Sequence, residues 1–247
     1  MFKFILYLTK LILITAFAIL FASCNYNVNL GPALKGDGNV VTENRNNDTD
    51  FTGIEVSRAL EVEIEQSNNR SITVIADKNL QNHILTQVEN GVLKITTDVD
   101  IKDAESKKII VKMPDIDALQ TSSAASITSK KIIRSNSLSL GSSSASLIDI
   151  LFEGEDLSAE TSSAGTIRLS GKALRLETDS SSGSVIEAEK LLANDVTSSA
   201  SSGSHTNVNP LVSLEAKASS GAHITYHNKP KNNLVKKSSS GGSISEQ

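Results

Sequence analysis

The sequence is most unusual in how few aromatic residues it contains. Its 247 residues include no Trp, 6 Phe and 3 Tyr, and five of these nine aromatic residues fall in the first 21 positions. Aromatic rings bring large buried areas to protein cores, and they are the usual platforms for stacking sugars, bases and ring cofactors. Their scarcity argues against an enzyme fold with a bulky core and against a surface that stacks nucleic acids or sugars.

The chain also lacks an excess of charge of one sign. It has 24 basic and 28 acidic residues, a formal net charge of −4, and no long run of either sign. Nucleic-acid-binding proteins usually carry a clustered basic surface, so we expect no nucleic-acid partner. The apolar residues are mostly Ile, Leu and Val in alternating runs, which is typical of strands. We therefore expect a folded, β-rich protein.

Cysteine occurs once, at the end of an apolar N-terminal run. Lys3 and Lys10 are the only charges before Cys24, and residues 11–23 are apolar or small. This pattern indicates a secretory signal peptide, since 13 residues are fewer than the roughly 20 that cross a membrane. Counting back through residues 4–8 keeps a membrane helix as an alternative. The residues just before the cysteine are Ala22 and Ser23.

This boundary resembles the lipobox of bacterial lipoproteins, although Phe21 stands where an aliphatic residue is usual. The resemblance implies that residues 1–23 are removed and that Cys24 becomes the lipidated first residue. Acyl chains would then bind the protein to a membrane. Residues 24–35 are polar and contain Asn, Gly and Pro, so we expect them to form a tether.

The first part of the body predicts strands with one hairpin. Apolar and polar residues alternate in several short runs, which is the pattern of half-buried strands. These runs lie at residues 51–56, 59–65, 71–75 and 92–96. Residues 36–43 indicate a turn that leads into a strand, and residues 108–114 a strand that ends at Pro114. Asn90-Gly91 between two runs favours a tight hairpin, because both residues tolerate positive φ. Residues 77–85 are the one segment that could form a short helix.

Serine is abundant where aromatics are scarce, and it follows a repeat. Of 37 Ser residues, 32 lie between Thr121 and Gln247, most of them in seven six-residue blocks. The blocks lie at residues 122–127, 142–147, 162–167, 180–185, 201–206, 219–224 and 239–244, and their ends are 18 to 21 residues apart. Flexible Ser/Gly linkers lack such a period. A unit of about 20 residues at roughly 3.3 Å each matches one coil of a solenoid.

We therefore predict an all-β fold, a right-handed parallel β-helix (β-solenoid) with coils of about 20 residues. Residues 36–247 would form one domain, with N-terminal coils at 36–120 and seven Ser-rich repeats at 121–247. Stacked Ser columns would hydrogen-bond along the ladder and leave room for only a thin core. Bulky side chains at Ala124, Ala145, Gly165 or Gly183 should then overpack that core. A bare edge at the last coil is expected to be covered by self-association, giving a homo-oligomer.

Candidate sites for chemistry are few. His205 and His223 hold the same position in neighbouring blocks, so they could stack within metal-bridging reach. No third ligand is placed by the repeat, and we expect two solvated imidazoles with no metal and no cofactor. No Gly-x-Ser-x-Gly elbow is present, so the repeated Ser residues are not candidate nucleophiles. A carbohydrate-active β-helix enzyme remains an alternative, although its clustered acids are missing.

Several segments together resemble the auto-transporter adhesin head GIN domain family, a domain of unknown function. They are Gly36–Glu43, Phe51–Ser57, Val62–Ile64, Ala76–Leu80, Val88–Ile95 and the repeated Ser-Ser-x-Gly/Ala blocks. The resemblance covers residues 36–247 and implies an exported, often lipid-anchored protein of Gram-negative bacteria with a β-solenoid-like fold. It carries over no catalytic or binding residues.

From these features we expect an outer-membrane lipoprotein of the cell envelope, exposed to the periplasm or to the surface. The protein would function in adhesion or as a structural component, without catalysis, and would contact an unknown protein or glycan partner. A periplasmic ligand-binding or signalling module is a further alternative.

Overall fold

The structure is a computed structural model that describes residues 33–46 and 49–247. The expected signal peptide at residues 1–23, the lipidation site Cys24 and most of the tether lie outside the described residues. The last three residues expected in the tether form strand β1 (Ala33–Lys35), which pairs in parallel with β8 (Asp100–Asp103). Within the described residues, no helix is both long and apolar enough to span a bilayer.

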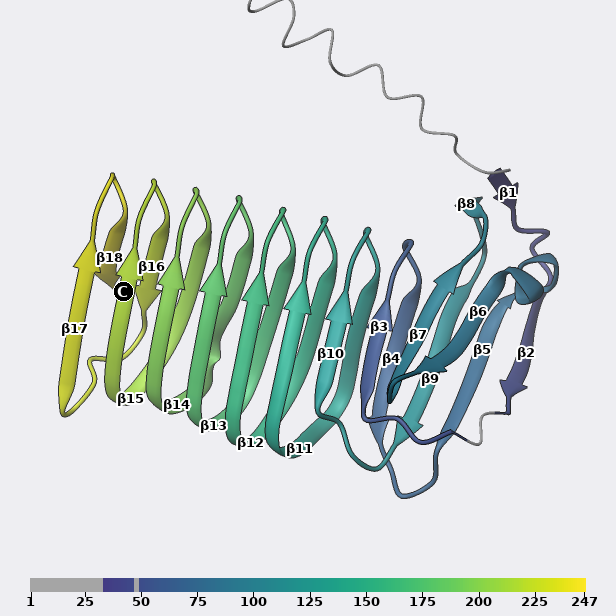
Figure 1. The fold of residues 1–247 in the computed structure, drawn as a ribbon, viewed down its shortest axis with the longest axis horizontal. Helices are drawn as coiled ribbons and strands as arrows, with labels where there is room; N and C mark the ends of the chain where they lie inside the picture. The colour runs from purple at the N-terminus through teal and green to yellow at the C-terminus, as the bar shows by residue number, and fades with distance from the viewer. Residues whose placement is uncertain (1–32, 47–48) are drawn as a thin grey trace, which may run out of the picture. The chain divides into compact units, whose positions relative to one another are not determined.

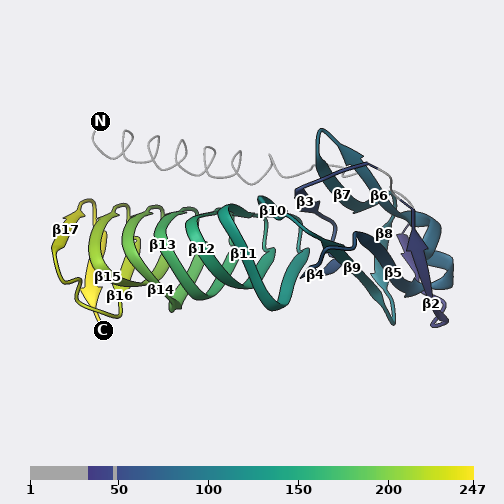
Figure 2. The ribbon, with the colours of Figure 1, turned by 90° about the horizontal axis from the view of Figure 1, so that it is seen from below.

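Most of the chain is a parallel β-solenoid of about six turns, which confirms the predicted fold class. Each long strand pairs in parallel with the strand one coil before it and the strand one coil after it. These strands are β11 (Ser126–Ser142), β12 (Leu147–Thr161), β13 (Thr166–Ser180), β14 (Val185–Ala200) and β15 (His205–Ala218). Figures 1 and 2 show how each coil bends back at a sharp turn, so that two faces run along the rod.

Antiparallel strands cover the N-terminal end of the solenoid. β2 (Val40–Arg45) pairs with β5 (Ser71–Asp77), β5 pairs with β9 (Lys107–Met113), and β6 (Ile84–Glu89) pairs with β7 (Val92–Thr97), all antiparallel. β3 (Gly53–Val56) and β4 (Glu61–Gln66) join this cap to the coils through parallel pairs with β10 (Ala118–Thr121) and β11. The hairpin at Asn90-Gly91 is confirmed, and the expected short helix is a 3₁₀ helix, η1 (Lys78–His83).

The interior is built from stacked aliphatic columns. Along one face, Ile127 lies in register with Ile148, and the column continues through Ile167 and Ile186, all fully buried. Identical side chains one coil apart pack against each other along the ladder. Narrow columns of this kind need little aromatic volume, which explains how the chain folds with so few rings.

The seven Ser-rich blocks form the sharp turns along one edge of the rod (Figure 1). In each block two consecutive residues have positive φ, as in a type I′ turn; Ser182 has φ 53° and Gly183 has φ 68°. The Ser181 carbonyl accepts a hydrogen bond of 3.2 Å from the Ser184 N–H, which closes the turn. Seven blocks delimit six intervals, in agreement with about six turns. An eighth turn of this type, at residues 57–60, lacks the Ser-Ser signal.

The expectation that bulky side chains would overpack the core is wrong for three of the four positions. Ala124, Ala145 and Gly183 are exposed at turn tips, and a Cβ added to Gly183 meets no atom within 4 Å. Gly165 is different, because a Cβ there would lie 2.3 Å from the Ser142 carbonyl oxygen. The restriction at the turn tips is therefore one of backbone conformation, and only Gly165 is limited by space.

The last coil is formed by β16 (His223–Tyr226), β17 (Asn233–Ser238) and β18 (Ser243–Glu246). Within the described residues, β17 pairs only with β15 and β18 pairs only with β16. The outer edges of β17 and β18 thus have no neighbouring strand in the part of the chain that the structure describes.

Candidate functional site

The row of Ser-rich turns forms a rigid edge, which we call the serine edge. It is defined by the first Ser of each turn: Ser122, Ser143, Ser162, Ser181, Ser201, Ser219 and Ser239. Consecutive turns are hydrogen-bonded to each other; the Ala145 N–H donates to the Ser163 carbonyl (3.1 Å) and the Gly183 N–H to the Ser202 carbonyl (3.1 Å). Because the backbone is hydrogen-bonded from coil to coil, this edge presents its side chains at fixed intervals.

Hydroxyl groups on the inner side of the turns bond to one another. The Ser180 hydroxyl lies 3.0 Å from the Ser204 hydroxyl and 2.7 Å from the Thr206 hydroxyl, and the Ser184 hydroxyl donates to Thr161 Oγ1 at 2.9 Å. Buried polar groups need such partners, because an unpaired one costs free energy. The predicted ladder of hydrogen-bonded hydroxyl groups is therefore present, and these Ser residues contribute to the packing of the interior.

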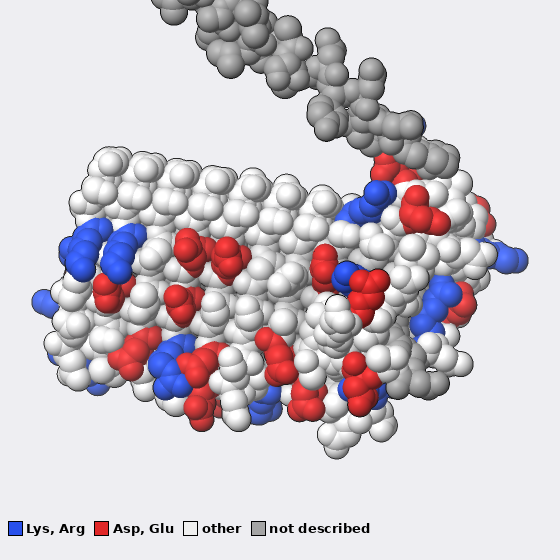
Figure 3. Space-filling view, viewed as in Figure 1, with Lys and Arg blue, Asp and Glu red and all other residues white. Residues whose placement is uncertain are grey.

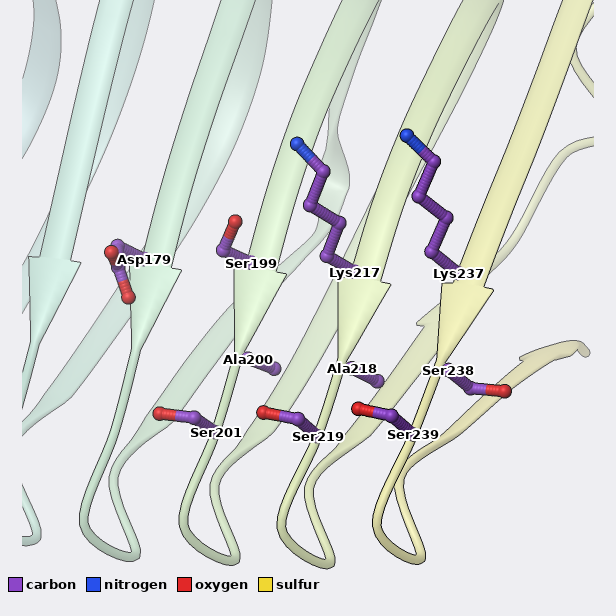
Figure 4. Close-up of a pocket in the computed structure, with 10 residues that line it drawn as sticks. All are labelled: Asp179, Ser199, Ala200, Ser201, Lys217, Ala218, Ser219, Lys237, Ser238 and Ser239. Carbon is purple, nitrogen blue, oxygen red and sulfur yellow. The ribbon is translucent and has the colours of Figure 1, made fainter.

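Two shallow hollows lie beside the serine edge, and we call them together the serine furrow. One stretch has a volume of about 430 Å³ and includes Ser201, Ser219 and Ser239 on one side and Lys217 and Lys237 on the other. Figure 4 shows the three Ser side chains pointing in one direction in a row, with the two Lys side chains next to each other. A second stretch of about 350 Å³ lies beside Ser122, Ser143 and Ser162. The furrow is lined mainly by small and charged side chains.

The wall of the furrow opposite the serine edge is a column of outward side chains, which we call the charged column. Its five members lie in register, one per coil, over the C-terminal coils: Glu160, Asp179, Ser199, Lys217 and Lys237. Toward the N-terminus the same register continues through Gly141, Gln120 and Glu55. Figure 3 shows two adjacent acidic side chains and two adjacent basic ones in one row, separated by one uncharged position. The charges on this column are thus grouped by sign.

Other outward columns alternate charges and pair them within the molecule. The Arg175 guanidinium binds both carboxylate oxygens of Asp156 in the next coil, and Arg168 Nε lies 2.7 Å from Glu187 Oε2. The hydrogen bond from Arg175 lowers the pKa of Asp156. The grouping by sign in the charged column therefore differs from these two columns.

Five described carboxyl groups have a clearly shifted pKa, and all five are lowered: Glu63, Glu65, Asp77, Asp156 and Glu215. For Glu63 the causes are hydrogen bonds from Lys108 and then Lys130, whose nitrogens lie 2.7 and 3.0 Å away. A glycosidase needs one carboxyl group with a raised pKa to act as general acid. These five carboxylates do not fit that role.

The two repeat histidines lie together, as the repeat alignment predicts. The rings of His205 and His223 stack with centroids 5.4 Å apart and planes 8° apart, and His223 Nδ1 contacts the Ser243 hydroxyl. Within the described residues, no group of three or more His, Cys, Asp or Glu could hold a metal ion. The expectation that this pair binds no metal stays a prediction.

Sequence reasoning missed the charged column, although the repeat carries its signal. Each member stands two residues before the first Ser of a turn, as Glu160 does before Ser162 and Lys217 before Ser219. Reading that one position across the seven blocks gives the order Gln, Gly, acid, acid, Ser, Lys, Lys. The sequence alone does not show that this position faces outward, and the strand register was needed for that.

These features define a class of protein, the parallel β-solenoids with a capped N-terminal end and Ser-rich type I′ turns. Residues 50–230 match the family model described as "Putative auto-transporter adhesin, head GIN domain", and the chain belongs to this family. The resemblance noted in the sequence is thereby confirmed. No curated protein matches the chain.

Three solved structures have the same fold. A "putative adhesin" from Bacteroides fragilis is 19% identical with a TM-score of 0.79, over 87% of this chain and 100% of that one. A "Putative lipid binding protein" from Parabacteroides distasonis is 20% identical, with a TM-score of 0.67 and coverage of 87% and 100%. A "putative adhesin" from Parabacteroides merdae is 16% identical, with a TM-score of 0.66 and coverage of 88% and 100%. At these identities the likeness concerns the fold.

Proposed function

We propose that this chain is an exported, lipid-anchored adhesion module of the cell envelope that acts by contact and without catalysis. The observation that carries the proposal is the serine edge with its furrow, an open, rigid surface that extends over many coils. Regular extended surfaces of this kind suit long partners such as a polysaccharide or an extended polypeptide. Membership of an adhesin-like family and the sequence before Cys24 support the same role.

A lipid-binding role, taken from the name of one structural neighbour, fits the furrow less well. Small-molecule sites are usually concave and mostly apolar. The furrow is open and presents Ser, Lys and Asp side chains. We therefore favour contact with a polar, extended partner.

Anchoring is tested with the substitution Cys24→Ala in the native cell. The wild-type chain should incorporate a fatty-acid label and fractionate with membranes, and the variant should lose the label. Ser23→Ala, which keeps the cysteine, serves as the control. A wild-type chain that stays unlabelled would overturn the anchoring.

Adhesion is tested with cells that display the full chain on immobilised glycans and matrix proteins. Ser201→Arg with Ser219→Arg places bulky side chains on the serine edge at exposed or half-buried positions, so folding should persist. We expect at least a fivefold loss of binding relative to wild type. Lys172→Glu, on an exposed position away from the furrow, is the control. Equal binding by cells without the protein would exclude adhesion.

A further inference from the structure

The charges of the charged column are complementary to the same column read in the opposite direction. Read along the rod, the order is acid, acid, neutral, base, base, at Glu160, Asp179, Ser199, Lys217 and Lys237. A two-fold axis through Ser199 that reverses the rod direction would place Glu160 opposite Lys237 of a second copy. It would place Asp179 opposite Lys217 in the same way. We propose that this face pairs with a second copy of the chain, as an antiparallel two-fold dimer centred on Ser199.

The isolated molecule leaves these charges poorly compensated. Glu160 and Asp179 lie directly opposite each other on neighbouring strands, and so do Lys217 and Lys237. Like charges at directly opposite positions destabilise a sheet. Glu160 and Asp179 are exposed, and neither forms an ion pair within the described residues. Glu215 compensates the two Lys residues in part, at 3.0 and 3.8 Å. A second copy in the antiparallel arrangement places an opposite charge across from each of these four side chains.

The surroundings of the column permit close approach. The serine edge on one side has short side chains, and Ala200 and Ala218 lie between the edge and the column. On the other side Glu177 and Glu215 would face each other across the same axis, roughly 7 Å further along the strands. Their repulsion confines the contact to the strip between the charged column and the serine edge. A C₂ contact of this kind is isologous, so one patch supplies both halves.

The size of the strip predicts weak association. Five coils at about 4.8 Å each give a contact roughly 24 Å long, at the small end of specific interfaces. Ion pairs in such a strip set the register of the two copies more than the strength of binding. This location also differs from the outer edge of the last coil, where Lys236 and Lys237 on β17 disfavour pairing of two like edges.

A single cysteine tests the axis in a Cys24→Ser background, which removes the one thiol of the native sequence. Ser199→Cys would lie against its own copy in the partner, so the purified full chain in detergent should form a disulfide dimer under mild oxidation. Ser158→Cys, also outward but two coils from the axis, would lie about 19 Å from its copy and should not. We expect at least a tenfold difference in dimer yield, decreasing in 1 M salt, where charges are screened beyond about 3 Å. Equal yields from the two variants would overturn the proposal.

Charge exchange tests the pairing in the Ser199→Cys background. Lys217→Glu with Lys237→Glu, and separately Glu160→Lys with Asp179→Lys, should each lower the dimer yield at least tenfold. Mixing these two variants should restore a mixed dimer, and combining all four substitutions should restore a homodimer. Lys172→Glu with Lys190→Glu changes the net charge equally at exposed positions away from the strip and should have no effect. Circular dichroism verifies that each variant is folded.

Loss of dimer in both charge variants without recovery in the mixture would show that charge complementarity is not the cause. Sedimentation of the wild-type chain as a monomer at every concentration and at low salt would likewise overturn the dimer. Neither result depends on membrane anchoring or on adhesion, because both measurements use the purified chain without cells.

Discussion

At the scale of single residues, the place within the type I′ turn determines what each small side chain does. The second and third residues of each turn have positive φ, which costs an L-residue other than Gly or Asn roughly 1–2 kcal/mol. Seven Ser residues accept that conformation at the second position, with φ between 47° and 53°. Hydrogen bonds between stacked turns, such as that from Ala124 N–H to the Ser144 carbonyl (3.0 Å), offset this cost.

Two glycines of neighbouring turns should therefore respond differently to the same change. Gly183→Ala places a Cβ in open space at φ 68°. The roughly 1–2 kcal/mol cost of positive φ is partly offset by the lower entropy of the unfolded alanine chain, so we expect a net loss of about 1 kcal/mol of unfolding free energy. Gly165→Ala brings a Cβ to 2.3 Å from the Ser142 carbonyl oxygen, and overpacking should cost about 1–3 kcal/mol. Urea unfolding at neutral pH measures both.

The reverse substitution Ala145→Gly is the matched control for the turn conformation. Ala145 has φ 59° and is exposed, so Gly should stabilise the protein slightly or leave it unchanged. A larger loss for Gly183→Ala than for Gly165→Ala would contradict this view of the turns.

At the scale of elements, the antiparallel cap is fastened by one buried carboxylate at the end of β5. Asp77 is 0% exposed and accepts hydrogen bonds from the N–H groups of Gly38 (3.1 Å), Ser106 (3.1 Å) and Glu105 (3.3 Å). It thus joins the segment before β2 to the segment before β9. Burial raises the pKa of Asp77, but the backbone hydrogen bonds together lower it by more, so its pKa lies below the ordinary value.

This carboxylate predicts an acid-dependent loss of stability. Because the pKa of Asp77 is lower in the folded state, its contribution is complete above the unfolded pKa and is lost as pH falls through the folded pKa. Asp77→Asn leaves buried N–H donors without an acceptor and should cost about 1–3 kcal/mol at neutral pH. The difference from wild type should shrink in acid, as measured by urea unfolding across pH. A constant difference at all pH values would exclude ionised Asp77 as the cause.

Most strands of this cap were predictable, but apart from the Asn90-Gly91 hairpin their directions were not. The predicted strands at 71–75 and 108–114 are present, and Asn90-Gly91 forms the hairpin because its φ values of 51° and 77° suit a tight turn. An alternating run has the same pattern in a parallel and an antiparallel sheet, so the sequence did not show that β5 covers the solenoid end. The turn at Arg58 and Ala59 was missed because it contains no Gly and no Ser-Ser pair.

For the candidate site, the repeat predicted which residues lie next to each other in adjacent coils, but not which side chains are exposed and which are buried. It placed His205 beside His223, because equal positions in a repeat stack in adjacent coils. It also predicted hydroxyl bonding, since the Ser residues recur at equal positions. Which Ser lies at an exposed tip and which is buried depends on the turn type, and that required φ angles.

At the scale of the whole molecule, the solenoid is quasi-one-dimensional, and its two ends differ. Each coil contacts its two neighbours, so stability is approximately the sum of coil and interface contributions. The N-terminal end is covered by the antiparallel cap, whereas β17 and β18 each have one partner strand within the described residues. Local opening should therefore be easiest at the last coil.

The coil position of a core side chain should decide the effect of its removal. Phe152 is 0% exposed in the middle of the rod, and Gly154 leaves room for its ring, because a Cβ on Gly154 would lie 2.6 Å from that ring. Phe152→Ala should cost about 3–5 kcal/mol of global stability, because the surrounding coils cannot close the cavity. Leu234→Ala, in the half-buried edge strand β17, should cost under about 1 kcal/mol and loosen only the last coil. Native-state hydrogen exchange separates the two: the first variant should speed exchange throughout β11–β14, and the second only in β15–β18. Uniform acceleration by Leu234→Ala would mean that the rod unfolds as one unit and that its open end has no separate stability.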